Sequence, residues 1–351
     1  MVARRILSGK LSTGRTHRAS LFDSVLNGVQ QLPLSVWVIY PVALGLLIVA
    51  FNALAWVAGL TPVGTFDLYR SSIPCYPIGS MMLIEYLNRV ARRAFASFRP
   101  ALTISDHEYL YLEYQLITMP RRGVHITLLL SLGLVTVYII NTPYIHALFQ
   151  TSHLIAIIEC VFYVFAFAVM AIYFYHILWQ LRMVSGIHAM LTHVDLFNRE
   201  SLYAFSQLSS HAGISLLLMT FFGIVTDPAT FSNIALINVT VIAFVLAILS
   251  FVLPLQGIYR HIIAEKRRLT QAIDADIGTL IQQVYSNSDT PVSANVMQQT
   301  IKLNSLATIR KTVEDIPTLP LQRGTLISFV SVFILTFVGR IAVAAIAALI
   351  V

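Results

Sequence analysis

Glu159 and Arg340 are charged side chains within stretches of sequence that are otherwise apolar. A charge inside a bilayer costs about 2.5–3.5 kcal/mol on insertion scales, so it usually finds an opposite charge or water. At about 1.5 Å of rise per helical residue, the two residues lie at similar depths, roughly 8–9 Å from the same membrane surface. We hypothesise that they form an intramembrane pair or face one aqueous vestibule. The alternatives are an Arg340 side chain that reaches the lipid headgroups and a Glu159 side chain in the interface.

A second group of residues with chemical interest is small and weakly polar, and it lies in the last apolar stretch. The group consists of Ser328, Ser331, Thr336 and Gly339. In membrane helices such residues favour close packing against a neighbouring helix. The functional alternative is that this side of the helix lines a pore, and the sequence leaves both interpretations open.

The sequence predicts no enzyme, no cofactor and no metal site. His176 and His211 lie in adjacent apolar stretches, where bis-histidine haem ligation is conceivable, but no further ligand spacing supports it. Two cysteines, Cys75 and Cys160, do not define a metal site or a disulfide framework. The chain has no HExxH, Walker, GxSxG or CxxC motif.

The elements that must position these residues are membrane helices, as the composition indicates. The chain has 351 residues, of which 57% are hydrophobic and 11% charged, and its mean hydropathy is +0.77. Soluble domains carry about 25% charged residues. We therefore predict an all-α polytopic protein of the cell (inner) membrane whose principal partner is the lipid bilayer.

Apolar runs of sufficient length predict about seven transmembrane helices. The expected spans are 34–59, 68–88, 124–142, 153–181, 204–225, 233–257 and 324–351. The second span is short and contains Pro74 and Pro77, so we expect an interrupted helix there.

The distribution of basic residues predicts the orientation of the chain. All lysines and arginines except Arg70 and Arg340 lie in segments 1–33, 88–122, 182–203 and 258–323. Positive charge marks the cytoplasmic side, so the N-terminus is expected inside and the C-terminus outside. The same bias explains the net charge of +7 without a nucleic-acid partner.

The spans divide the chain into four parts. Residues 1–33 form a basic tail with an amphipathic helix at 20–32, which either lies at the membrane interface or packs on the core. Residues 34–257 form a six-span bundle, in which segment 89–122 is cytoplasmic. There Ser105 and Glu108 predict a capping box that starts a helix at 106–119.

The remaining two parts are a cytoplasmic hairpin with its linker, 258–323, and the final span, 324–351. Apolar residues repeat at helical spacing in 258–284 and 292–313, so each is predicted to be an amphipathic helix. The two helices are expected to pack on each other or on neighbouring subunits. The candidate anchor residues are Ile262, Leu269, Ile273, Leu280, Leu303 and Leu306.

Three stretches resemble signature sequences of an uncharacterised bacterial family of polytopic membrane proteins. They are YLNRVARRAFASFRPAL (86–102), EYLYLEYQLITMPRR (108–122) and DLFNRESLYAFSQLS (195–209). This resemblance covers most of the chain and implies a membrane protein, but it implies no activity.

The expected topology is also similar to that of the insect odorant and gustatory receptor channels. That similarity implies that 324–351 lines a tetrameric cation pore and that 258–315 anchors the subunits. The gustatory motif, a Thr-Tyr start and a Gln-Phe end, is missing, because this chain has Thr325-Leu326 and no glutamine after Gln322.

Three functions remain open from the sequence. The first is an oligomeric ion channel, ligand-gated or constitutive, with the last helix lining the pore. The second is a non-conducting membrane scaffold or sensor that binds a cytoplasmic partner through 258–315. The third is a transporter of small solutes.

Overall fold

A computed structural model describes residues 20–102, 104–188, 199–226, 234–286 and 294–316, together with residues 324, 327–332, 334, 335 and 338. Within these ranges every regular element is a helix. In chain order they are α2 (Leu21–Gln30), α3 (Val36–Val57), α4 (Leu68–Ser72), α5 (Cys75–Phe98), η1 (Arg99–Ala101), α6 (Asp106–Ile117), α7 (Arg121–Asn141), α8 (Pro143–Thr151), α9 (His153–His188), α10 (Arg199–Thr226), α11 (Ile234–Ser286) and α12 (Ala294–Glu314).

Four helical segments in the described residues are long and apolar enough to cross a membrane. They are Val36–Val57, Arg121–Asn141, His153–Ile187 and Ser206–Thr226. A shorter apolar segment of α11 covers Ile237–Ser250. These helices support a membrane protein with an all-helical bundle, as the composition predicts.

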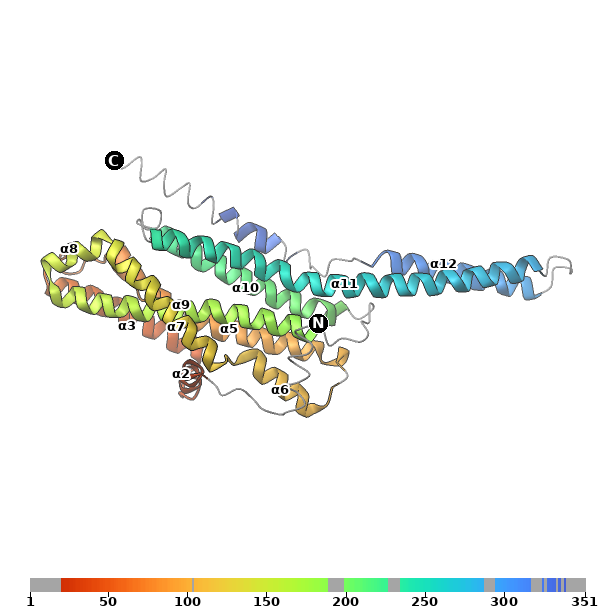
Figure 1. The fold of residues 1–351 in the computed structure, drawn as a ribbon, viewed down its shortest axis with the longest axis horizontal. Helices are drawn as coiled ribbons and strands as arrows, with labels where there is room; N and C mark the ends of the chain where they lie inside the picture. Colours follow the sequence, from red (N-terminus) through yellow and green to blue (C-terminus); the bar gives the residue numbers. More distant parts are fainter. Residues whose placement is uncertain are drawn as a thin grey trace.

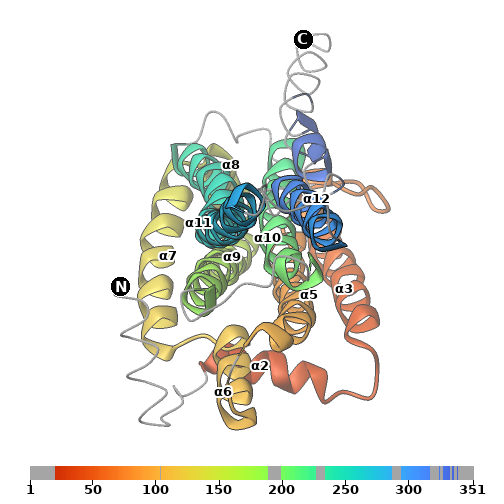
Figure 2. The same cartoon turned by 90° about the vertical axis from the view of Figure 1, so that its right-hand side faces the viewer.

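Helices α5, α9, α10 and α11 run side by side along the longest axis of the molecule, as Figure 1 shows. Figure 2 views the bundle along that axis and shows α7 crossing it at a slant. Many aliphatic side chains point outward from the bundle, such as Leu129, which is 72% exposed, and Leu154, which is 71% exposed. In water this surface would favour association, whereas a bilayer solvates it at no cost. The exposed apolar surface therefore supports a bundle that is surrounded by lipid.

The interruption predicted for the second span lies at Ile73 and Pro74. Helix α4 ends at Ser72, and α5 begins at Cys75 with Pro74 at its N-cap. Proline cannot donate a backbone hydrogen bond, so it separates a five-residue helix from the long helix that follows. Because of this break, the helical register of α5 does not set the direction of the α4 side chains.

Two capping boxes fix the helices on one side of the bundle. Ser105 caps α6, and the Ser105 backbone N–H and hydroxyl both donate to the Glu108 carboxylate, which confirms the predicted start of that helix. These hydrogen bonds lower the pKa of Glu108. Ser20 and Asp23 form the same motif at α2, and the buried Asp23 also accepts from the Met119 backbone N–H.

Helix α2 runs across the axes of the bundle helices, as Figures 1 and 2 together show. Leu26 is buried in the core, whereas Leu21 and Val25 are 67% and 53% exposed. The helix therefore has one face packed on the core and an exposed apolar face, and its position at a membrane interface stays a prediction.

Helix α11 is continuous over 53 residues, so the expected boundary between the sixth span and the hairpin at residue 258 has no break. Pro254 lies inside this helix, as prolines of membrane helices often do. Helix α12 packs back along the polar half of α11 (Figure 1). The Arg310 Nε atom lies 2.9 Å from the Asp274 Oδ1 atom across the hairpin.

The candidate anchor residues of the hairpin serve contacts within the chain. Ile262 is 1% exposed and belongs to a core cluster with Phe95 and Ile187, and Leu269 packs against that cluster. Ile273 is also buried. Leu280, Leu303 and Leu306 are half-buried. Anchoring of a second subunit through these side chains stays a prediction.

Helices α10 and α11 approach each other closely at Gly213 of α10. A Cβ atom there would lie 2.8 Å from Phe329 Cε2 and 3.2 Å from the Ala247 carbonyl oxygen. The glycine therefore brings α10, α11 and the C-terminal stretch into contact at one point.

We predict that Gly213→Ala destabilises the protein, although alanine is the better helix former by about 1 kcal/mol. Crowding against Phe329 and Ala247 should lower the free energy of unfolding by roughly 1–3 kcal/mol. Thermal unfolding of the full-length protein in detergent measures this. A Cβ atom at Gly133 would meet no other atom within 4 Å, so Gly133→Ala is the control. Equal stability of both variants would contradict the close approach.

Candidate functional site: a buried ion pair beside an aromatic pocket

A buried ion pair joins α4 to α9. The Arg70 Nε atom donates to the Glu159 Oε1 atom at 2.9 Å, and the two side chains are 4% and 2% exposed. Isolated burial of either charge would be unfavourable by several kcal/mol. The pair therefore fixes the short helix α4 against the first turns of α9.

The partner of Glu159 is thus Arg70, and the expected partner, Arg340, lies outside the described residues. The opposite charge expected for Glu159 is present, but it comes from the start of the second expected span, 68–88, and not from a long apolar run. Arg70 lies just before the proline break. A signal was present in the sequence, because Arg70 is the single basic residue between the basic segments 1–33 and 88–122.

Tyr144 of α8 completes this ion-pair cluster. Its hydroxyl accepts from the Arg70 Nη2 atom at 2.6 Å and donates to the Glu159 Oε1 atom at 3.3 Å. Burial, and then the neighbouring Glu159 carboxylate, raise the pKa of the Tyr144 hydroxyl, so it keeps the proton that it donates. The Glu159 Oε2 atom has no hydrogen-bond partner among the described residues.

Asn52 of α3 holds α4 in place from the other side. Its Nδ2 atom donates to the Ser71 hydroxyl at 2.9 Å, and its Oδ1 atom accepts from the Asp67 backbone N–H at 3.0 Å. The Asp67 side chain in turn caps α4 by accepting from the Tyr69 backbone N–H. Both the N-cap and the fourth residue of this five-residue helix are therefore tied to α3.

The residue before Arg70 belongs to a cluster of tyrosine hydroxyls. The Tyr69 hydroxyl lies 2.7 Å from the Tyr138 hydroxyl and 3.1 Å from the Tyr163 hydroxyl. The Tyr69 ring also meets the Tyr144 ring edge to face at 5.0 Å. Arg70 of α4 thus forms the ion pair, and its neighbour Tyr69 contacts the tyrosine hydroxyls of α7 and α9.

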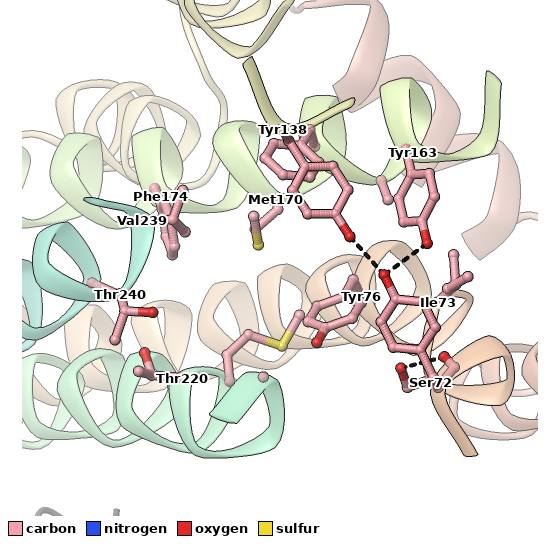
Figure 3. A pocket seen from close by; sticks show the side chains of 16 residues that line it. Ser72, Ile73, Tyr76, Tyr138, Tyr163, Met170, Phe174, Thr220, Val239 and Thr240 are labelled. Carbon is pink, nitrogen blue, oxygen red and sulfur yellow. Dashed lines mark hydrogen bonds between the residues drawn. The ribbon is translucent and has the colours of Figure 1, made fainter. Parts of the chain in front are cut away.

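The tyrosine cluster forms one end of a pocket inside the bundle (Figure 3). The pocket offers a volume of about 80 Å³ to the centres of water-sized molecules. One water needs about 10–15 Å³ on this measure, so there is room for a molecule of several heavy atoms. Met170 lies near the middle, and Thr220 and Thr240 lie at the far end (Figure 3).

The chemistry of the pocket walls is aromatic and apolar with few polar groups. Its lining comprises Tyr69, Ser72, Ile73, Tyr76, Tyr138, Tyr163, Ala166, Phe167, Met170, Phe174, Met219, Thr220, Gly223, Val239, Thr240 and Ala243. The Tyr76 hydroxyl lies 3.2 Å from the Thr226 hydroxyl. None of the lining side chains is charged, so the site suits a small apolar molecule that carries a hydroxyl or carbonyl group.

The four small residues expected at the pore are only partly within the described residues. Ser328 and Ser331 are exposed, and the Ser328 hydroxyl donates to the Gly324 carbonyl of its own helix. The side that faces the bundle carries Phe329, which is 8% exposed. Thr336 and Gly339 lie outside the described residues, so their interpretation is unchanged.

The histidines that raised the question of haem lie in different surroundings. His176 is fully buried in α9, and neither ring nitrogen has a hydrogen-bond partner among the described residues. The His211 Nδ1 atom lies 2.8 Å from the Tyr86 hydroxyl. The described part of the chain contains no cluster of three or more potential metal ligands.

No family model, curated protein or solved structure matches the chain. The two resemblances seen in the sequence therefore stay predictions.

We predict that loss of one member of the ion pair is more harmful than loss of both. Arg70→Met or Glu159→Met alone should destabilise the protein by about 3–5 kcal/mol, because the remaining charge is buried without its partner. The double variant should recover much of that loss. Thermal unfolding of full-length variants in detergent gives the coupling energy.

Arg340→Met combined with Glu159→Met provides the matched control. If Arg70 is the partner, the effects of Arg340 and Glu159 should add independently. Strong coupling to Arg340 with additivity to Arg70 would reverse the assignment.

Proposed function

We propose that the chain is a seven-span protein of the cell membrane that senses a small apolar molecule and opens an ion path along its last helix in an oligomer. The basic residues support an N-terminus inside and a C-terminus outside. In this proposal α4 with α5 is the second span, the apolar part of α11 is the sixth, and 324–351 is the seventh.

The observation that carries this proposal is the uncharged aromatic pocket within the bundle. A helix bundle with only a structural task would tend to fill such a space with side chains. The pocket combines hydroxyl groups at both ends with apolar walls, which is the composition expected of a site for a small ligand.

The helices around the pocket supply a route from ligand to pore. Met219 and Thr220 of α10 and Ala243 of α11 line the pocket. The same two helices meet Phe329 of the C-terminal stretch at Gly213. A ligand that alters the spacing of α10 and α11 would therefore act on the last helix directly.

The scaffold or sensor function has an observation of its own in favour. Met297, Ile301 and Ile309 of α12 are 70%, 57% and 48% exposed. An apolar surface on the polar hairpin is suited to a second copy of the chain or to a cytoplasmic partner.

The proposal is tested with the full-length protein in a planar bilayer, with small phenols and aliphatic alcohols as probes. We expect discrete single-channel currents that change on adding a probe of the right size, and a defined oligomer in native mass spectrometry. A monomer without current would favour the scaffold, and solute flux without discrete currents would favour a transporter.

We predict that Ala243→Phe abolishes the response to the probes, because the larger ring fills the pocket that Ala243 lines. Ala50→Phe adds the same ring to an exposed position of α3 and should leave the response intact. Thermal unfolding verifies that both variants fold. An unchanged response of the Ala243 variant would place the ligand elsewhere.

A further inference from the structure

A second cavity, separate from the aromatic pocket, lies where α2, α3 and α5 meet. It offers about 230 Å³ to the centres of water-sized molecules. Its lining consists of Gln30, Val36, Glu85, Asn88, Arg89 and Arg92. Four of these residues are at positions i, i+3, i+4 and i+7 of α5, so they share one face of that helix.

The two arginines of this cavity are exposed and available to a ligand. Arg89 stacks over the Trp37 ring, with its guanidinium carbon 5.0 Å from the ring centroid. Within the described residues, neither Arg89 nor Arg92 takes part in an ion pair. Stacking on Trp37 orients one guanidinium without using its N–H donors, which suits recognition of a phosphate group.

The third charge in the cavity has the opposite sign. Glu85 is half-buried, and its two carboxylate oxygens each lie 2.8 Å from the Gln30 Nε2 atom. Gln30 is the last residue of α2, so the cross-lying helix holds this carboxylate at the cavity. A carboxylate beside two guanidinium groups favours a ligand that carries both a negative and a positive group.

The position of the cavity places it at a bilayer surface. Val36 is the first residue of a membrane-spanning candidate, α3. The neighbouring Leu32, Leu34 and Val38 are 50%, 61% and 47% exposed. Helix α2 lies across the bundle beside them (Figure 2). Charged groups thus adjoin an outward apolar surface at the depth where lipid headgroups meet their acyl chains.

We propose that this cavity binds the headgroup of an aminophospholipid. The phosphate accepts hydrogen bonds from the guanidinium groups of Arg89 and Arg92, and the primary ammonium donates to the Glu85 carboxylate. The acyl chains lie along Leu34 and Val38. The proposal needs α3 to span the membrane, but it does not depend on the aromatic pocket or on conduction.

Other lipid headgroups satisfy only part of this arrangement. A phosphatidylglycerol headgroup supplies the phosphate but no ammonium group to donate to the Glu85 carboxylate. A phosphatidylcholine headgroup supplies both charges, but its quaternary ammonium has no N–H to donate. Phosphatidylethanolamine supplies the phosphate and three ammonium donors, so it should bind most tightly.

The test measures lipid binding to the intact, delipidated protein by native mass spectrometry, with phosphatidylethanolamine, phosphatidylglycerol and phosphatidylcholine of identical acyl chains. The unmodified protein should prefer phosphatidylethanolamine over either other lipid by about tenfold, as expected for one charge-assisted hydrogen bond. Equal binding of all three lipids would overturn the proposal, whatever the behaviour of any variant.

Variants then locate the site. Arg89→Gln with Arg92→Gln should weaken phosphatidylethanolamine binding about tenfold or more, whereas Arg121→Gln with Arg122→Gln, at the exposed start of α7, should not. Glu85→Gln should remove the preference for phosphatidylethanolamine over phosphatidylglycerol. An equal effect of the two arginine pairs, or a preference that survives Glu85→Gln, would contradict the assignment.

Soluble headgroups distinguish a lipid from a free phosphate compound. Phosphoethanolamine and inorganic phosphate, added in place of lipid, should bind at least tenfold more weakly than phosphatidylethanolamine, because they lack the acyl chains that contact Leu34 and Val38. Soluble phosphoethanolamine that binds as tightly as the lipid would show that the cavity serves a free metabolite instead.

Discussion

The arrangement of α4, α8 and α9 depends on the ion pair between Arg70 and Glu159. Two buried charges are tolerable only when each compensates the other, and further hydrogen bonds to the pair reduce the cost of its burial. This requirement brings α4, α8 and α9 together, with Tyr144 donating to one charge and accepting from the other. Because Arg70 follows Tyr69 directly, the same contact also sets one wall of the aromatic pocket. A local electrostatic constraint thus determines the shape of an uncharged site.

On the other side of the pocket, close packing of α10 against α11 holds the wall in place. Helices α10 and α11 can approach each other because Gly213 has no side chain. Phe329 enters that contact from the C-terminal stretch. The pocket is therefore bounded on one side by a wall that an ion pair holds in place. On the other side its wall is formed by α10 and α11, whose spacing depends on close packing at Gly213.

The helices themselves could be predicted from the sequence because their signals are local. Apolar runs gave α3, α7 and α9 to within a few residues, the Ser105–Glu108 pattern gave the start of α6, and Pro74 gave the break before α5. The continuity of α11 could not be predicted from the change in composition at residue 258, since a helix can pass from lipid to water without a break when no residue stops it. A change in composition indicates where the surroundings of a helix change from lipid to water, but it does not indicate where the helix ends.

The candidate site was harder to predict because its contacts are distant in sequence. The Arg70 and Glu159 residues are separated by 89 positions, and Tyr69 and Tyr163 by 94. The sequence indicated that Glu159 needs a partner, but the choice between two arginines depends on how the helices pack. The tyrosine cluster had no sequence signal at all, because isolated tyrosines in membrane helices are common at interfaces.

The unbroken α11 has a mechanical consequence. Its part beyond Ser250 extends for roughly 50 Å at 1.5 Å per residue, and α12, which is about 30 Å long, packs against it. A stiff lever of this kind magnifies small rotations, so a tilt of about 5° near the membrane would swing its far tip by about 5 Å. A tilt too small to change the packing of the bundle would thus displace the far end of the α11–α12 hairpin by several ångströms.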